Sequence, residues 1–178
     1  MTDPVPVRIR VLGMGNVLMG DDGLGPAVIH ALKIGWDWPS DVELVDVGTP
    51  GLNLTPFLAG VPYVLLVDVA EHDGAIGEVR TFSQQEVLHL PAPQRVSPHD
   101  PGLREALLAL EFAGEGPQEF RLVAARPEKV GTGPGLSEKA QAAIPETSRA
   151  VIASLAAWGA LPKERDAVDF TQPWWLKE

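Results

Sequence analysis

The sequence predicts an α/β fold, in which a twisted, mainly parallel sheet of about five strands forms the middle layer of a three-layer α/β/α sandwich. Apolar segments typical of strands alternate with segments that have helical spacing. Residues 63–69 are almost wholly apolar, as expected for a strand covered on both faces. No linker or internal repeat divides the chain, so residues 1–178 are predicted to form a single domain.

The elements follow from periodicity and from the turns between them. Residues 7–12 alternate apolar side chains with Arg8 and Arg10, as in a strand with an open face. The strand at 78–82 is shorter and is predicted to run antiparallel, and Pro145 is expected to mark a boundary or irregularity in the last helix. In order, the predicted strands cover residues 7–12, 42–47, 63–69, 78–82 and 120–125, and the predicted helices cover residues 23–34, 52–58, 103–112 and 136–158.

The C-terminal tail, from about residue 165, has an unusual density of aromatic side chains: Phe170, Trp174 and Trp175. We expect it to pack back on the domain, with docking of a partner as the alternative.

Composition excludes several classes of protein. The net charge of −10 and the absence of a basic patch argue against a nucleic-acid partner. Without cysteine, any metal ion must be bound by oxygen and imidazole ligands. The chain also has no apolar run of the roughly 18 residues that span a membrane, and no secretory signal is recognisable. We therefore expect a cytoplasmic protein without a membrane partner.

The run from Gly13 to Gly25 is the first candidate site, because it places glycines and two adjacent carboxylates after a strand. A dinucleotide-binding loop would need its third glycine at position 18, where the chain has Leu18, so a nucleotide-binding domain is disfavoured and no cofactor-binding residues are predicted. The two adjacent carboxylates, Asp21 and Asp22, favour binding of a cation rather than of a nucleotide.

Residues at the exits of parallel strands can meet at one edge of the sheet. Asp22 and Asp68 occupy such exits, and the proline-bounded loop that carries His99 can reach the same edge. Two carboxylates and one imidazole suit a first-row divalent metal and leave positions open for substrate or water.

Each of these residues has a competing interpretation. Asp22 can simply cap the following helix, and Asp21 competes with it for both roles. A histidine in a loop usually hydrogen-bonds or faces solvent, and His72 rivals His99 because it follows Asp68 closely. Spacing alone leaves these alternatives open.

Several motifs in order resemble the nickel-dependent hydrogenase maturation endopeptidases. They lie within residues 7–155 and are Gly13-x-Gly15-Asn16-x-Leu18-x-x-Asp21-Asp22-x-x-Gly25, Gly48-Thr49-Pro50-Gly51, Leu65-Leu66-Val67-Asp68, Ser97-Pro98-His99, Arg126-Pro127-Glu128 and Leu136-Ser137. Enzymes of this family remove a C-terminal extension from the large-subunit precursor of nickel-iron hydrogenases.

The resemblance implies that Asp22, Asp68 and His99 are both the metal ligands and the catalytic residues. The metal is the nickel that the precursor already carries, although other divalent ions can fill the site of the isolated protein. Many similar proteins have Glu at the position of Asp22, and Gln often follows the histidine where this chain has Asp100. The implied reaction is hydrolysis of one peptide bond in a hydrogenase large-subunit precursor.

Two points stay open at the level of sequence. A metal ion can polarise the scissile carbonyl or lower the pKa of a bound water while a carboxylate accepts a proton, and the sequence does not apportion these roles. The same three residues would also serve a non-catalytic nickel-sensing or chaperone module that binds the precursor without cleaving it.

Overall fold

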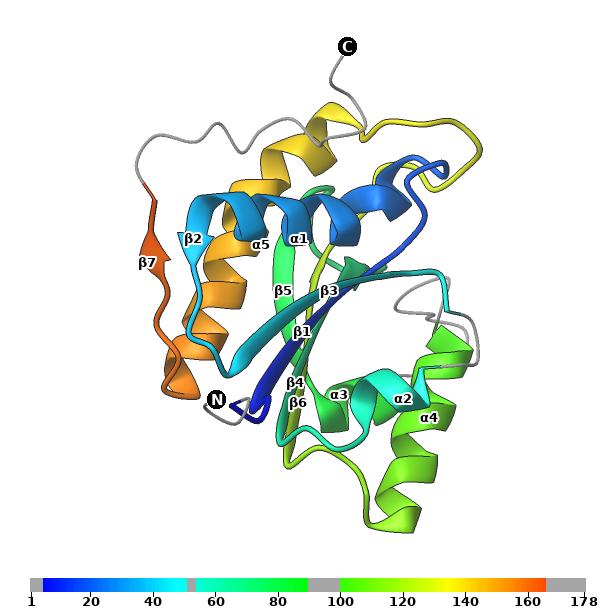
Figure 1. Cartoon of the computed structure of the whole chain (residues 1–178). Helices are drawn as coiled ribbons and strands as arrows, with labels where there is room; N and C mark the ends of the chain where they lie inside the picture. The colour runs from blue at the N-terminus through cyan, green and yellow to red at the C-terminus, as the bar shows by residue number, and fades with distance from the viewer. Residues whose placement is uncertain (1–4, 51–53, 90–99, 166–178) are drawn as a thin grey trace.

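A five-stranded sheet with helices on both faces makes up most of the structure, which is a computed structural model (Figure 1). It describes residues 5–50, 54–89 and 100–165. The strand order is β3-β1-β4-β6-β5, with only β5 antiparallel to its neighbour. The strands are β1 (Ile9–Met14), β3 (Val42–Gly48), β4 (Tyr63–Val69), β5 (Val79–Ser83) and β6 (Glu119–Ala125). The predicted fold class and the antiparallel direction of the short strand are confirmed.

The helices form the two outer layers and are α1 (Leu24–Gly35), α2 (Thr55–Leu58), α3 (Gln84–His89), α4 (Asp100–Ala113) and α5 (Glu138–Ala157), with a 3-10 turn, η1 (Asp21–Gly23), before α1. One apolar cluster lies between the sheet and α1 with α5, and a second lies between the sheet and α2, α3 and α4. Alternation along β4 serves both clusters, because Leu65 and Val67 face the first and Val64 and Leu66 face the second.

Strand β1 is not the open strand that its sequence predicts. It lies between β3 and β4, and both of its faces are covered. Arg8 lies just before the strand and Arg10 near its start, and both reach acidic partners: Arg8 Nε lies 2.8 Å from Asp41 and Arg10 Nε lies 2.6 Å from Glu43. The alternation therefore marks ion pairs near the edge of the sheet rather than a solvent-facing side.

Other differences concern local structure. Helix α3 and a two-stranded antiparallel pair, β2 (Trp36–Asp37) with β7 (Lys163–Glu164), were not predicted, and α2 is shorter than predicted. Of the boundary or irregularity expected near Pro145, the boundary is wrong, because α5 continues through this residue. Pro145 is exposed, whereas Ile144, Thr147 and Val151 are buried on the face that packs on the domain, and this packing maintains the helix. The aromatic tail lies outside the described residues.

Helix α1 packs unusually close to the sheet at Gly25. A Cβ atom at this position would overlap the Met14 carbonyl oxygen and lie 2.6 Å from the Val67 carbonyl oxygen. Both neighbours are backbone atoms of central strands, so they cannot move aside as a flexible side chain can. The contact fixes the N-terminal end of α1, and with it η1, against the ends of β1 and β4.

We therefore expect Gly25→Ala to lower the free energy of unfolding by more than about 2 kcal/mol, because overpacking here must displace backbone. Chemical unfolding followed by circular dichroism measures the change. Gly131→Ala is the matched control, since its Cβ would meet only Lys129 Cε at 3.6 Å. Equal stability of the two variants would contradict this account of the packing.

Candidate metal site at the carboxyl edge of the sheet

The turn after β1 has a defined backbone path. Gly15 has a φ of 136°, and a side chain there would overlap the carbonyl oxygen of Asp22. Asn16 then organises the loop, because its side-chain oxygen accepts a hydrogen bond from Leu18 N at 2.9 Å and its carbonyl accepts one from Met19 N at 2.9 Å. The turn thus brings the acidic pair back toward the end of β1.

Asp22 lies in η1 and is only 3% exposed. Its Oδ2 accepts a hydrogen bond from Asn16 N at 2.8 Å. The N-cap residue of α1 is Gly23, so Asp22 does not occupy the cap position of that helix. The capping role that the sequence allowed for Asp22 is therefore not observed, and its carboxylate belongs to the turn.

Asp68 is the penultimate residue of β4 and is fully buried. Its Oδ1 accepts a hydrogen bond from Val69 N at 2.8 Å. Gly13 of β1 pairs with Val67 of β4, so Asp68 lies level with the end of β1, from which the turn to Asp22 departs. The structure therefore places Asp22 and Asp68 at the same, carboxyl edge of the sheet.

Helix α4 begins at this edge too. Residues 114–118 connect its C-terminal end to the start of β6, and the helix packs over the sheet through Leu103, Leu107 and Leu110. A helix of 14 residues is about 21 Å long, roughly the length of a seven-residue strand, so α4 spans the sheet from the carboxyl edge to the opposite edge. Asp100, its first residue, follows His99, which itself lies outside the described residues.

Asp21 has a role that the sequence did not reveal. It is 1% exposed, and its carboxylate accepts hydrogen bonds from Glu128 N at 2.8 Å, Lys129 N at 3.1 Å, Ser137 N at 2.7 Å and Ser137 Oγ at 3.0 Å. Ser137 Oγ in turn accepts from Ala140 N, which caps α5. Asp21 therefore ties the turn after β1 to the loop after β6.

His72, the rival candidate ligand, is engaged within its own loop. Its Nδ1 accepts a hydrogen bond from Gly74 N at 3.1 Å, which leaves Nε2 to donate to the Glu78 carbonyl at 3.2 Å. Burial, and next the positive charge of Arg80, lower the pKa of His72, so the neutral ring is favoured. Both ring nitrogens thus stabilise the connection between β4 and β5.

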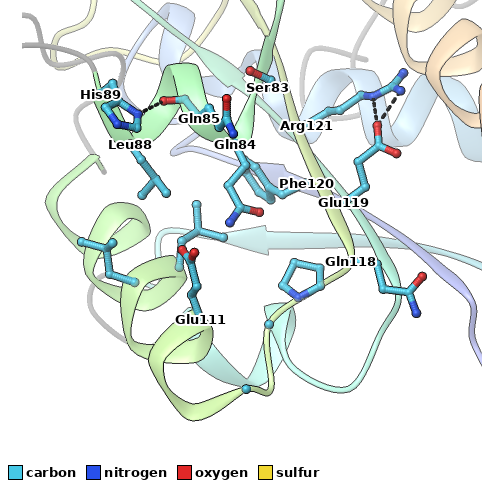
Figure 2. A pocket seen from close by; sticks show the side chains of 15 residues that line it. Ser83, Gln84, Gln85, Leu88, His89, Glu111, Gln118, Glu119, Phe120 and Arg121 are labelled. Atoms are coloured by element: carbon cyan, nitrogen blue, oxygen red, sulfur yellow. Dashed lines mark hydrogen bonds and ion pairs between the residues drawn. The ribbon is translucent and has the colours of Figure 1, made fainter.

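A groove of about 920 Å3 lies elsewhere, between α3, α4 and the start of β6 (Figure 2). Leu88, Glu111 and Phe120 line it, and Figure 2 shows the Arg121 side chain turned toward Glu119. Glu119 is the first residue of β6, so the groove lies at the edge of the sheet opposite Asp22 and Asp68. It is not part of the candidate metal site.

The two buried carboxylates define what this edge can bind. Oxygen ligands of this kind bind divalent first-row metals, and a cation lowers the cost of burying two like charges together. Within residues 5–50, 54–89 and 100–165, no three acidic or histidine side chains form a metal-binding group.

No helix in these ranges is long and apolar enough to span a membrane.

The fold and this edge define an α/β protein with a carboxylate site at the ends of two central parallel strands. Comparisons identify its family. The sequence model of the hydrogenase maturation proteases matches residues 26–154. The hydrogenase 2 maturation protease of Escherichia coli K12 is 34% identical over 161 residues, which cover 89% of this chain and 98% of that protein. The protein HupD of Rhizobium leguminosarum, named for hydrogenase expression and formation, is 28% identical over 166 residues, 89% of this chain and 82% of its own length.

A solved structure agrees with these matches. The hydrogenase maturating endopeptidase HybD of E. coli superposes with a TM-score of 0.82 at 32% identity, covering 89% of this chain and 98% of that one. The chain belongs to the hydrogenase maturation protease family, whose members are peptide-bond hydrolases.

We expect Asp21→Asn to lower the free energy of unfolding by about 2–3 kcal/mol, because one acceptor oxygen of this buried side chain becomes an amide group that faces N–H and O–H donors. Thermal and chemical unfolding measure this. Asp46→Asn is the matched control, since within the described residues exposed Asp46 accepts one side-chain hydrogen bond, from Gly48 N at 3.0 Å, through an oxygen that asparagine keeps. A stability of Asp21→Asn equal to that of the control would contradict the bridging role.

Proposed function

We propose that this chain cleaves the C-terminal extension from the large-subunit precursor of a nickel-iron hydrogenase after nickel has been inserted. The observation that carries the proposal is the pair of buried carboxylates, Asp22 and Asp68, at one edge of the sheet in a hydrogenase maturation protease. The substrate class is that for which the E. coli relative is named.

In this proposal the nickel belongs to the substrate, and Asp22, Asp68 and His99 bind it from one side. Two observations support the set. Helix α4 begins at the carboxyl edge, immediately after His99, and the ring nitrogens of His72 are already hydrogen-bonded in another loop. Carboxylate and imidazole groups suit a first-row metal, so the residue types fit the ion.

Backbone hydrogen bonds orient both carboxylates for the proposed hydrolysis. Nickel carried by the bound precursor would supply Lewis acidity, which can polarise the scissile carbonyl or lower the pKa of a bound water. Asn16 N donates a hydrogen bond to Asp22 Oδ2, and Val69 N donates one to Asp68 Oδ1. Each carboxylate is therefore oriented by the backbone before the substrate binds. A carboxylate oriented in this way can bind the metal through one oxygen and accept a proton from the attacking water through the other.

We expect His99→Ala to abolish cleavage of a nickel-loaded precursor under anaerobic conditions, because one of the three ligands is lost. Mass spectrometry of the precursor measures the loss of its extension. His72→Ala is the control: it removes loop hydrogen bonds and is expected to retain cleavage at a temperature where circular dichroism shows it folded.

Other outcomes separate the alternatives. Loss of cleavage in folded His72→Ala with retention in His99→Ala would overturn the ligand assignment. No cleavage of a cognate precursor by the wild-type chain would contradict the proposed function, and a stable one-to-one complex without product would identify a non-catalytic nickel-sensing module. A precursor prepared without nickel is expected to remain uncut.

A further inference from the structure

Strand β3 forms one edge of the sheet and has unused backbone groups. Ile9 N donates to the Asp41 carbonyl at 3.1 Å, so odd-numbered residues of β3 direct their backbone groups toward β1. Because this direction alternates along a strand, Leu44 and Asp46 direct their N–H and C=O groups away from β1. Within the described part of the chain these outward groups have no hydrogen-bond partner.

The end of β3 is joined directly to the candidate site. Gly15 N, in the turn that leads to Asp22, donates to the Gly48 carbonyl at 2.9 Å. The register shifts between Gly13 and Met14, leaving Val47 as an extra residue in β3, and such bulges redirect a strand end. A peptide lying along the outer edge of β3 would therefore reach the site by passing Gly48 and Thr49.

The opposite edge of the sheet, formed by β5, is less suitable for binding a peptide that must reach the candidate site. With strands about 4.8 Å apart, a strand added outside β3 lies about 12 Å from the midpoint between β1 and β4, whereas a strand added outside β5 lies about 17 Å from it. The side chains of β3 also favour an apolar peptide, because Leu44 on one face of the sheet and Val45 and Val47 on the other face are only partly buried. In Figure 1, β3 runs across the front of the sheet.

We propose that the C-terminal extension of the precursor binds as an added strand, antiparallel to β3, beside Val42–Asp46. This inference rests on the proposed function. The chain upstream of the scissile bond belongs to the folded precursor, so the free segment downstream is the one available to pair. It leaves the site at the carboxyl end of β3 and runs against the direction of that strand.

The geometry sets a minimum length for the extension. About four extended residues bridge the 12 Å from the site to the edge, and about five more pair with residues 42–46. An extension shortened below about nine residues would lose part of this pairing, and one of about four residues would lose all of it, although the scissile bond is intact.

The test is a proline at the outward-facing position, Leu44→Pro, which removes an N–H donor to the added strand without removing a bond to β1. We expect kcat/KM for nickel-loaded precursor to fall about three- to tenfold, the effect of losing one hydrogen bond. Thr81→Pro is the matched control. Arg126 N donates to the Glu78 carbonyl, so even-numbered residues of β5 face β6, and exposed Thr81 is the equivalent outward position on the other edge. Its kcat/KM is expected to be unchanged.

A second measurement does not depend on the proline folding. A synthetic peptide with the sequence of the extension is added to the isotope-labelled wild-type chain, and amide hydrogen exchange is followed by nuclear magnetic resonance. We expect new protection at Leu44 and Asp46 and none at Thr81.

Cleavage by the wild-type chain with no such protection, and with equal rates for the two proline variants, would overturn the added strand while leaving the proposed function intact. Protection at Leu44 and Asp46 that appears without peptide and rises with protein concentration would assign the edge to a second copy of the chain and also overturn it. Absence of any cleavage by the wild-type chain, by contrast, would count against the proposed function itself.

Discussion

The buried carboxylate of Asp21 is the interaction on which the geometry of this edge depends. Four hydrogen bonds hold it to the loop after β6 and to the start of α5. They explain how Asp21 can be buried beside the equally buried Asp22, because backbone and hydroxyl donors of another segment satisfy its carboxylate. With Asp21 held, its neighbour Asp22 is fixed beside the ends of β1 and β4. The close contact of Gly25 with both strands fixes the same turn from the side of α1.

Parallel strands bring the candidate site residues to one edge of this molecule. The ends of β1 and β4 carry the two carboxylates, α4 starts there directly after His99, and the end of β3 is hydrogen-bonded to the turn that leads to Asp22. We therefore propose that metal recognition, hydrolysis and binding of the extension all take place at this edge of the sheet. The groove between α3 and α4, at the opposite edge, is not needed for any of these steps.

The sequence was most informative where burial alone determines structure. The apolar run 63–69 predicted β4 with its observed bounds and placed Asp68 near its exit, because few structures accommodate such a run. The sequence was misleading where tertiary contacts determine the local structure. Arg8 and Arg10 suggested a strand with an open face, but both form ion pairs. Pro145 suggested a helix end, but α5 continues through it because the helix packs on the domain through its buried face. Local sequence could not separate Asp21 from Asp22, because the donors to Asp21 lie more than 100 residues away. The choice between His72 and His99 came from family resemblance, and His99 stays a prediction.

The central claim is that Asp22, Asp68 and His99 bind one metal ion. A crystal structure of the chain with bound nickel, or with another divalent first-row ion, tests it most directly. We expect carboxylate oxygens of Asp22 and Asp68 and a ring nitrogen of His99 within about 2.0–2.2 Å of the same ion. An ion bound by His72, or His99 directed away from the two carboxylates in the metal-bound protein, would contradict it.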